Sequence, residues 1–274
     1  MTKRAGVISP FLEHHRLSGH VGSIALELAG FALLACTAFV FAGGVKGLTG
    51  LGLPTTAIGL LTLFIEPRVA IAVVLFPMVF TNAWQVWRMG DIAGALRRYI
   101  WFAGVLMIGV GVTTMLAAQA SDRLIFAVTG MVIILFVAVN FLLSPPKLPD
   151  RYDRTAQIVM GTIAGIMGGL TAVWGPPMAI YLSARQVEKD EFVRVTGLLI
   201  FLGSLPLVAG YVVAGFLTLP LAVMSGALIL PTLAGFALGE RIRGNLPQAK
   251  FRKVLLYVFL VLGLNLIRRA IWNV

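Results

Sequence analysis

Two matched segments rich in glycine and proline hold the residue types of this chain that are best suited to bind a ligand. Residues 47–54 read GLTGLGLP, and residues 169–176, which lie 122 positions later, read GLTAVWGP. Each segment interrupts a long apolar run. Because glycine permits non-helical backbone and proline lacks an amide donor, neither run forms one continuous helix. A broken helix at membrane depth is tolerated only where it is packed in protein or lines a polar cavity, and in transporters it usually marks the substrate site.

The chemistry that these segments predict is the binding of an anion. Pro54 opens one predicted helix, and Pro176 and Pro177 open the other, because proline suits the first helical turn. The remaining amides of that turn point into the break, where the helix macrodipole adds about half a positive charge. Thr49 and Thr171 would each add a hydroxyl donor. The residues predicted to bind the substrate are Lys46, Thr49, Gly50, Gly52, Pro54, Thr55, Asn82, Thr171, Trp174, Gly175, Pro176 and Pro177.

Several of these residues also have a purely structural interpretation. Glycine and proline let membrane helices kink and pack closely, although two matched copies favour a substrate site. Lys46 follows 18 uncharged residues and adjoins the first break. It either has a functional role at the predicted site or extends its ammonium group to the membrane interface. Trp174 is either a pocket wall or a packing aromatic residue. Asn82 and Gln85 favour hydrogen bonds between helices over contact with a ligand.

The composition indicates an integral membrane protein. Of the 274 residues, 59% are hydrophobic and 12% are charged, against about 25% charged residues in soluble domains. The mean hydropathy is +0.94, and several charge-free stretches reach the roughly 20 apolar residues that a spanning helix needs. The net charge of +11 comes from basic residues scattered between apolar runs. This distribution favours membrane topology and argues against a nucleic-acid partner.

The apolar runs predict an all-α integral membrane fold made by inverted duplication of two halves, with about 8–10 helical segments. The predicted segments are 21–43, 52–64, 69–87, 96–118 and 123–143 in the first half, and 155–171, 177–184, 192–214, 220–238 and 251–271 in the second. The second segment of each half is short. It is therefore either re-entrant or crosses the membrane as part of a broken pair.

The duplication also divides the chain into parts. Phe126 and Asn140 recur 125 residues later as Phe251 and Asn265, so the repeat extends over the whole half. The predicted parts are a polar tail (1–20), a first transmembrane repeat (21–143), a linker (144–154) and a second transmembrane repeat (155–274).

Basic residues in the short loops predict that both chain termini lie on the non-cytoplasmic side. One arrangement places 14 of the 22 lysines and arginines on the cytoplasmic side and 7 on the other, in line with the usual excess of positive charge inside. In this arrangement the loop near Asp91 and its counterpart near Gly215 lie on opposite sides of the membrane. The two halves therefore have inverted orientations.

Few residues of this chain could catalyse a reaction or hold a cofactor. His14, His15 and His20 all lie in the tail and Cys36 is the only cysteine, so we expect no metal site and no Ser-His-Asp or Cys-His constellation. Among the 11 acidic residues only Glu27 falls in a predicted span. A relay of carboxylates for protons is therefore not expected. The sequence predicts neither an enzyme nor a cofactor.

Together these features resemble the TauE/SafE family of bacterial sulfite and organosulfur-anion exporters. The resemblance rests on the GLTGLGLP motif near the first span, its counterpart around residues 174–177, the basic loops and the duplicated halves, and it extends from about residue 30 to residue 272. It implies export of a small sulfur anion, such as sulfite, sulfoacetate or a similar sulfonate, across the bacterial inner membrane by alternating access. The implied partners are this anion and the lipid bilayer. The sequence leaves a homo-oligomer open.

Other functions stay open on the sequence alone. An importer of thiosulfate, sulfide or a similar sulfur compound would have the same features, because the sequence does not fix the direction of transport. In an anion channel the two breaks would form a filter. A membrane scaffold without transport activity is the third alternative.

Overall fold

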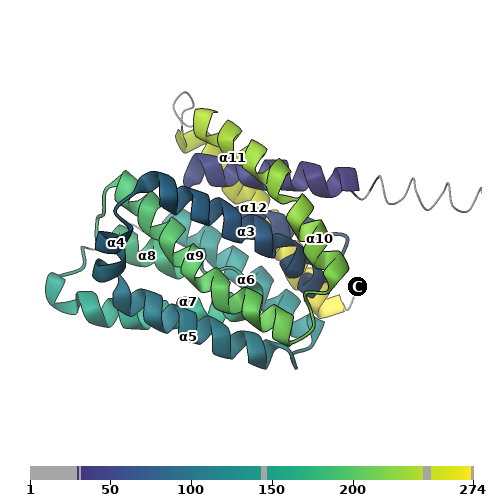
Figure 1. Ribbon diagram of the computed structural model, residues 1–274, viewed down its shortest axis with the longest axis horizontal. Helices are drawn as coiled ribbons and strands as arrows, with labels where there is room; N and C mark the ends of the chain where they lie inside the picture. Colours follow the sequence, from purple (N-terminus) through teal and green to yellow (C-terminus); the bar gives the residue numbers. More distant parts are fainter. Residues whose placement is uncertain (1–29, 31, 143–146, 243–247, 273–274) are drawn as a thin grey trace, which may run out of the picture.

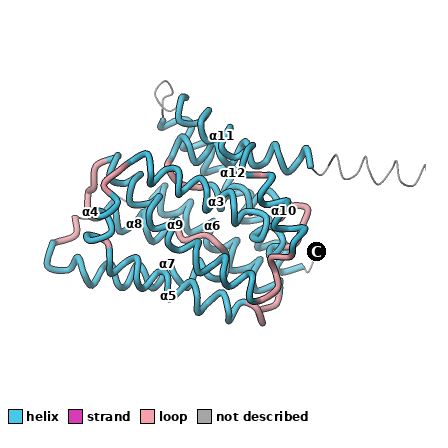
Figure 2. The backbone as a smooth tube through the Cα atoms, in the orientation of Figure 1, coloured by secondary structure: helices cyan, strands magenta, loops and turns pink. Residues whose placement is uncertain are grey.

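A computed structural model describes residues 30, 32–142, 147–242 and 248–272, and the regular elements in this part of the chain are all helices (Figures 1 and 2). Six are long and apolar enough to cross a membrane: Ala32–Thr49, Pro67–Met89, Ile100–Ala117, Asp122–Val139, Asp190–Val213 and Leu219–Ile242. The predicted all-α membrane fold is confirmed. The predicted tail, His14, His15, His20, Glu27 and the start of the first span lie outside the described residues, as do residues 144–146 of the predicted linker.

The helices follow the predicted order with more divisions. After Ala32–Thr49 the first half contains α2 (Leu53–Leu61), α3 (Pro67–Met89), α4 (Ile92–Arg98), α5 (Ile100–Ala117) and α6 (Asp122–Leu142). The second half contains the short 3-10 helix η1 (Asp150–Tyr152), α7 (Asp153–Thr171), α8 (Gly175–Ala184), α9 (Lys189–Val213), α10 (Leu219–Ala227), α11 (Ile229–Ile242) and α12 (Gln248–Trp272).

Three predicted segments differ from the structure in their bounds. The fourth segment of each half is two helices, divided at Tyr99 and at Leu228. In the second half Pro231 accounts for the division, because it lacks the amide that would bond to the preceding turn. The first helix continues to Thr49 instead of ending at Gly43. A Cβ at Gly43 would collide with the backbone of Thr232 on α11, so this glycine permits close packing and does not end the helix.

Both short helices turn back toward the end of the bundle from which their broken pair started. Arg185, at the end of α8, pairs with Asp150 and Asp153 at the start of α7. Similarly, α2 leads into α3 at Pro67, whereas Lys46 lies near Glu240, the partner of Arg88 at the opposite end of α3. The contacts do not distinguish a re-entrant pair from one that crosses the bilayer and returns, so both forms that the sequence allowed stay predictions.

Glycines bring pairs of helices into backbone contact. A Cβ at Gly165 on α7 would lie 2.9 Å from the Cα of Gly109 on α5. Likewise, side chains at Gly47 and Gly239 would collide with the backbones of α11 and of the Ala32–Thr49 helix, respectively. Small residues of this kind are the usual means of helix association in membranes. In Figure 1, α5 and α7 lie along one margin of the bundle and α11 along the other, with α3 and α9 between them.

The pairing follows one rule in both halves. The first helix of one half packs in parallel against the last part of the fourth segment of the other half: α7 against α5, and Ala32–Thr49 against α11. Between α6 and α12, the contacts of Gly130 with Gly263 and of Phe136 with Phe259 indicate an antiparallel crossing. An inverted duplication would produce this exchange of partners, but the duplication itself stays a prediction.

The outer surface of the bundle suits a lipid environment. Large apolar side chains such as Ile108, Val213 and Leu230 are exposed on three different helices. Soluble monomers rarely expose apolar surface on this scale. These faces are therefore expected to contact the hydrocarbon part of a bilayer.

Candidate functional site

The first break is a two-glycine turn closed by a threonine. Gly50 and Gly52 have φ angles of 79° and 97°, which glycine adopts without the steric cost that other residues meet. The hydroxyl of Thr49 accepts a hydrogen bond from the amide of Leu51 at 3.2 Å and lies 2.9 Å from the carbonyl oxygen of Val45. Pro54 then occupies the first turn of α2.

The second break repeats this arrangement with different residues. The hydroxyl of Thr171 accepts from the amide of Val173 at 3.1 Å and donates to the carbonyl oxygen of Met167 at 2.8 Å. Ala172 takes the left-handed conformation, with φ of 57°, although its Cβ makes that conformation costly by about 1–2 kcal/mol. α8 then begins at Gly175, with Pro176 and Pro177 in its first turn.

Both threonines therefore have a local role in holding their breaks in shape. A hydroxyl has one proton to donate, and the carbonyl oxygens inside each break already compete for it. The role of Thr49 and Thr171 as donors to an anion stays a prediction.

Lys46 lies in the interior of the protein, one turn before the first break. Its side chain is 1% exposed, so its ammonium group does not extend to the protein surface. Nζ donates a hydrogen bond to Oδ1 of Asn82 on α3 at 2.5 Å. The amide nitrogen of Asn82 donates to the carbonyl oxygen of Met78 at 2.7 Å, which fixes the amide with its oxygen toward the lysine.

The charge of Lys46 has no direct anionic partner among the described residues. Asn82 is neutral, and the ring of Phe236 lies 5.9 Å from Nζ. Glu240 on α11 attracts Lys46 electrostatically, but its carboxylate is bound to Arg88 at 2.5 Å. Keeping an uncompensated charge out of water costs several kcal/mol. An anion beside Lys46 would offset part of that cost.

The second break lacks this charge and is filled by an aromatic ring. At the same offset of 122 residues, Gly168 corresponds to Lys46, Ser204 to Asn82 and Trp174 to Gly52. A Cβ at Gly168 would lie 2.5 Å from the ring of Trp174, and one at Gly203 would lie 3.2 Å from it. Trp174 thus packs between α7 and α9, and its Nε1 has no hydrogen-bond partner among the residues that the structure describes.

A pair of phenylalanine rings links the two breaks. A Cβ at Gly52 would lie 3.9 Å from Phe259 on α12, and one at Gly175 would lie 3.7 Å from Phe136 on α6. The two rings meet edge to face, with their centroids 5.7 Å apart. Each break therefore touches one ring of the pair that forms the α6–α12 crossing. Sequence reasoning missed both rings, because they lie outside the repeated motif.

The predicted site residues fall into two groups. Lys46, Thr49, Gly50, Gly52, Pro54, Thr55 and Asn82 gather around the first break, and Thr171, Trp174, Gly175, Pro176 and Pro177 form the second. Arg88 and Glu240 near Lys46 were not predicted. Their only signal in the sequence was their position at helix ends.

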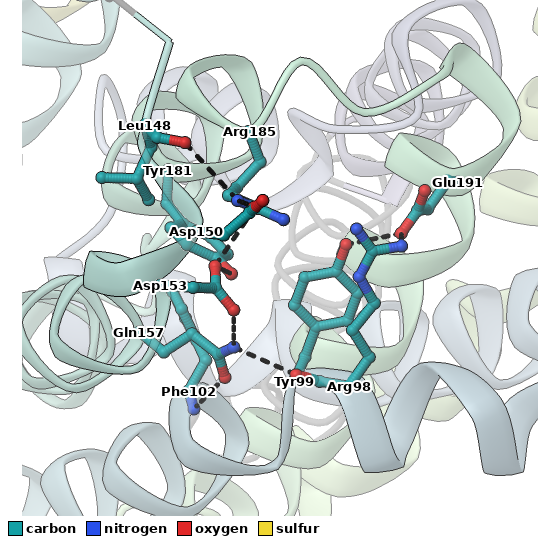
Figure 3. Close-up of polar contacts among 10 residues, drawn as sticks. All are labelled: Arg98, Tyr99, Phe102, Leu148, Asp150, Asp153, Gln157, Tyr181, Arg185 and Glu191. Atoms are coloured by element: carbon teal, nitrogen blue, oxygen red, sulfur yellow. Dashed lines mark hydrogen bonds and ion pairs between the residues drawn. The ribbon is translucent and has the colours of Figure 1, made fainter.

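A polar network closes the end of the bundle where α8 finishes (Figure 3). Arg98 pairs with Glu191 at 2.8 Å, and the hydroxyl of Tyr99 donates to the same carboxylate at 2.6 Å. Asp153 accepts from the hydroxyl of Tyr181 at 2.8 Å. Burial and the bond to Glu191 raise the pKa of Tyr99 above its usual value, so this phenol stays a neutral donor.

The same network fixes the end of α8. Arg185 pairs with Asp150 at 2.6 Å and with Asp153 at 3.2 Å. The guanidinium of Arg185 holds the pKa of the Asp150 carboxyl below its usual range. Gln157 donates to Asp153 at 2.9 Å and to the carbonyl oxygen of Arg98 at 3.0 Å. These contacts tie the end of α8 to the start of α7, and α7 to the end of α4.

Comparison with known protein families decides the class of the chain. The family model described as sulfite exporter TauE/SafE matches residues 35–266, a range that includes both breaks and Lys46. The chain belongs to the TauE/SafE family. No curated protein and no solved structure matches it. As a TauE/SafE protein whose described residues include six helices able to span a bilayer, it is a multi-pass membrane transporter of sulfur-containing anions.

Proposed function

We propose that this TauE/SafE protein exports a small sulfur oxyanion, sulfite or a sulfonate such as sulfoacetate, across the bacterial inner membrane. The anion binds at Lys46 beside the first break, and both chain termini lie on the non-cytoplasmic side. One observation carries the proposal: the ammonium group of Lys46 is buried at a broken helix, and its hydrogen-bond acceptor, Asn82, is neutral.

The first break is better suited to an anion than the second. In the first turn of α2, the backbone amides of Leu53 and Thr55 make no hydrogen bond within the helix. The first amide that does is that of Thr56, which donates to the carbonyl oxygen of Gly52 at 2.9 Å. In α8 the adjacent Pro176 and Pro177 have no amide donors. The first break therefore has three sources of positive potential: the unused amides of α2, the helix macrodipole of about half a charge and the ammonium group of Lys46.

Access from the Arg88 end requires little energy. The Arg88–Glu240 ion pair lies next to Lys46, and both of its side chains are partly exposed. An ion pair in such a position contributes about 0–1 kcal/mol, so an incoming anion could replace Glu240 as the partner of Arg88. Positive loop charge places this end on the cytoplasmic side.

Release occurs at the other end when the two halves rock about the site. There Arg68 on α3 pairs with Asp122 on α6 at 2.6 Å and lies over the ring of Phe216 at 5.1 Å. In the proposed cycle these contacts separate when the exit opens. Because Lys46 is buried, a carrier with an enclosed site fits better than a channel with a continuous aqueous pore past this residue.

The membrane potential is sufficient to drive export. In a cell that is negative inside, expelling one negative charge is favourable by about 2.3 kcal/mol per 100 mV. Transport can therefore run without a coupled ion, in line with the sequence, which predicts no relay of carboxylates for protons.

The test is electrogenic flux in liposomes. Purified protein should move labelled sulfite or sulfoacetate with saturation and counterflow when a potential is imposed. Lys46→Met should lose this flux, and Lys147→Met, which removes an exposed lysine outside the predicted spans, should retain it. Large unitary currents would indicate a channel, and flux only in the inward direction would indicate an importer. Wild-type protein without anion flux at any potential would refute transport by this chain.

A further inference from the structure

Gln85 on α3 is a second buried polar residue near Lys46, and one of its two polar atoms lacks a partner. Its side chain is 3% exposed. Nε2 donates a hydrogen bond to the carbonyl oxygen of Val193 on α9 at 2.6 Å. Oε1 is buried and has no hydrogen-bond partner among the described residues. Because the bond to Val193 requires the nitrogen on that side, the unpaired atom is the acceptor.

Gln85 belongs to the surroundings of the first break. It follows Asn82 by three residues, and helical residues at this spacing share a face. Asn82 in turn holds Lys46. Val193 connects the same group to the break itself, since a Cβ at Gly50 would lie 3.1 Å from its side chain. Lys46, Asn82, Gln85 and the break thus surround one region between α3, α9 and the end of the Ala32–Thr49 helix.

An unpaired acceptor in this position is costly. Leaving a buried polar atom without its hydrogen bond costs about 1–3 kcal/mol, and native proteins contain few such atoms. An anion that offered only acceptor oxygens would bind Lys46 but would leave Oε1 of Gln85 unpaired. An anion with a hydrogen-bond donor would satisfy both residues at once.

We propose that the transported anion carries its own hydrogen-bond donor, which Oε1 of Gln85 accepts while Lys46 binds the anionic oxygens. This inference rests on the proposed function and narrows it. It favours monoanions with a hydroxyl group, including hydrogen sulfite and hydroxyl-bearing sulfonates. It disfavours sulfoacetate and fully deprotonated sulfite, which have no donor at neutral pH.

The test compares two sulfonates of equal charge that differ by one hydroxyl group, ethanesulfonate and 2-hydroxyethanesulfonate. Their dissociation constants are measured with the detergent-solubilised full chain. The wild-type protein should bind 2-hydroxyethanesulfonate about tenfold more tightly, as one net hydrogen bond allows. In Gln85→Met both ligands should bind with the affinity of ethanesulfonate. Gln157→Met, which alters a buried glutamine whose two polar atoms are partnered, should keep the preference.

Three results with these sulfonates would overturn this inference. Equal binding of the two ligands by the wild type, an unchanged preference in Gln85→Met, or loss of both ligands in that variant would each refute the role of Gln85. If the wild type binds neither sulfonate, the affinity for sulfite is measured as a function of pH. Tighter binding at pH values below the pKa of hydrogen sulfite supports the inference, and an affinity that does not depend on pH refutes it. If no anion binds at any pH, the proposed function fails as well.

Discussion

At the first break, the residue one turn before the turning point is Lys46, and the corresponding residue of the second break is Gly168. The backbones of the two breaks agree, down to a threonine hydroxyl that accepts from the amide two residues later. The side chains near them differ: the charged Lys46 corresponds to Gly168, and the amide of Asn82 corresponds to the hydroxyl of Ser204.

Two breaks with the same backbone conformation therefore need not both form a ligand site. In the second half, the ring of Trp174 lies against Gly168, where Lys46 has its side chain in the first half. One break is thus packed for stability, and the other keeps a charge at a cost in stability. From this asymmetry we expect one anion to bind per chain.

The largest effects on stability should come from alanine at the helix contacts next to each break. Gly47→Ala forces a methyl group against the backbone of Phe236 and Glu240, whereas Gly169→Ala meets mainly the side chain of Thr113. Overpacking typically costs 1–3 kcal/mol. We expect about 3 kcal/mol for Gly47→Ala, which meets backbone, and less for Gly169→Ala.

Thermal unfolding in detergent measures both losses. Gly104→Ala is the control, because nothing lies within 4 Å of a Cβ at that position. A Gly47→Ala variant as stable as Gly104→Ala would contradict the close contact between the first helix and α11.

A smaller effect should separate the packing role of Trp174 from ligand binding. Gly168→Ala brings a methyl group to 2.5 Å from the Trp174 ring and should cost about 1–3 kcal/mol. A smaller residue at position 174 should restore part of this loss, so Gly168→Ala and Trp174→Leu should couple in a double-mutant cycle. Anion affinity should stay unchanged in Gly168→Ala. Lost affinity with unchanged stability would instead assign Trp174 to the substrate site.

The smallest effects should come from the two threonines. Thr49→Val and Thr171→Val each remove a hydroxyl that closes a break, at a cost of about 1 kcal/mol each. Serine at either position should restore stability, because it keeps the hydroxyl. Equal losses would support the shared structural role. Loss of anion binding in Thr49→Val alone would show that Thr49 also contacts the substrate.

The sequence predicted the backbone of both breaks because glycine, proline and threonine act through local geometry. It also indicated the family and the short helix that follows each break. It failed at Gly43, since glycine that permits close packing and glycine that ends a helix look alike until the neighbouring helix is known.

The pairing of side chains was beyond the reach of the sequence. Lys46 and Asn82 lie 36 residues apart on different helices, and their contact depends on the rotation of both helices. The same holds for Glu240 and Arg88, which are 152 residues apart. The residues near Lys46 could therefore be identified only from the three-dimensional structure.

Anion-dependent thermal stability of Lys46→Met tests the central claim most directly. With sulfite at 100 times its dissociation constant, the wild-type protein should gain about 2.7 kcal/mol. Lys46→Met should fold, because it removes a buried charge that has no anionic partner among the described residues and whose desolvation costs several kcal/mol, and it should gain nothing from sulfite. The same sulfite-dependent gain in Lys46→Met as in the wild type would contradict an anion site at the first break.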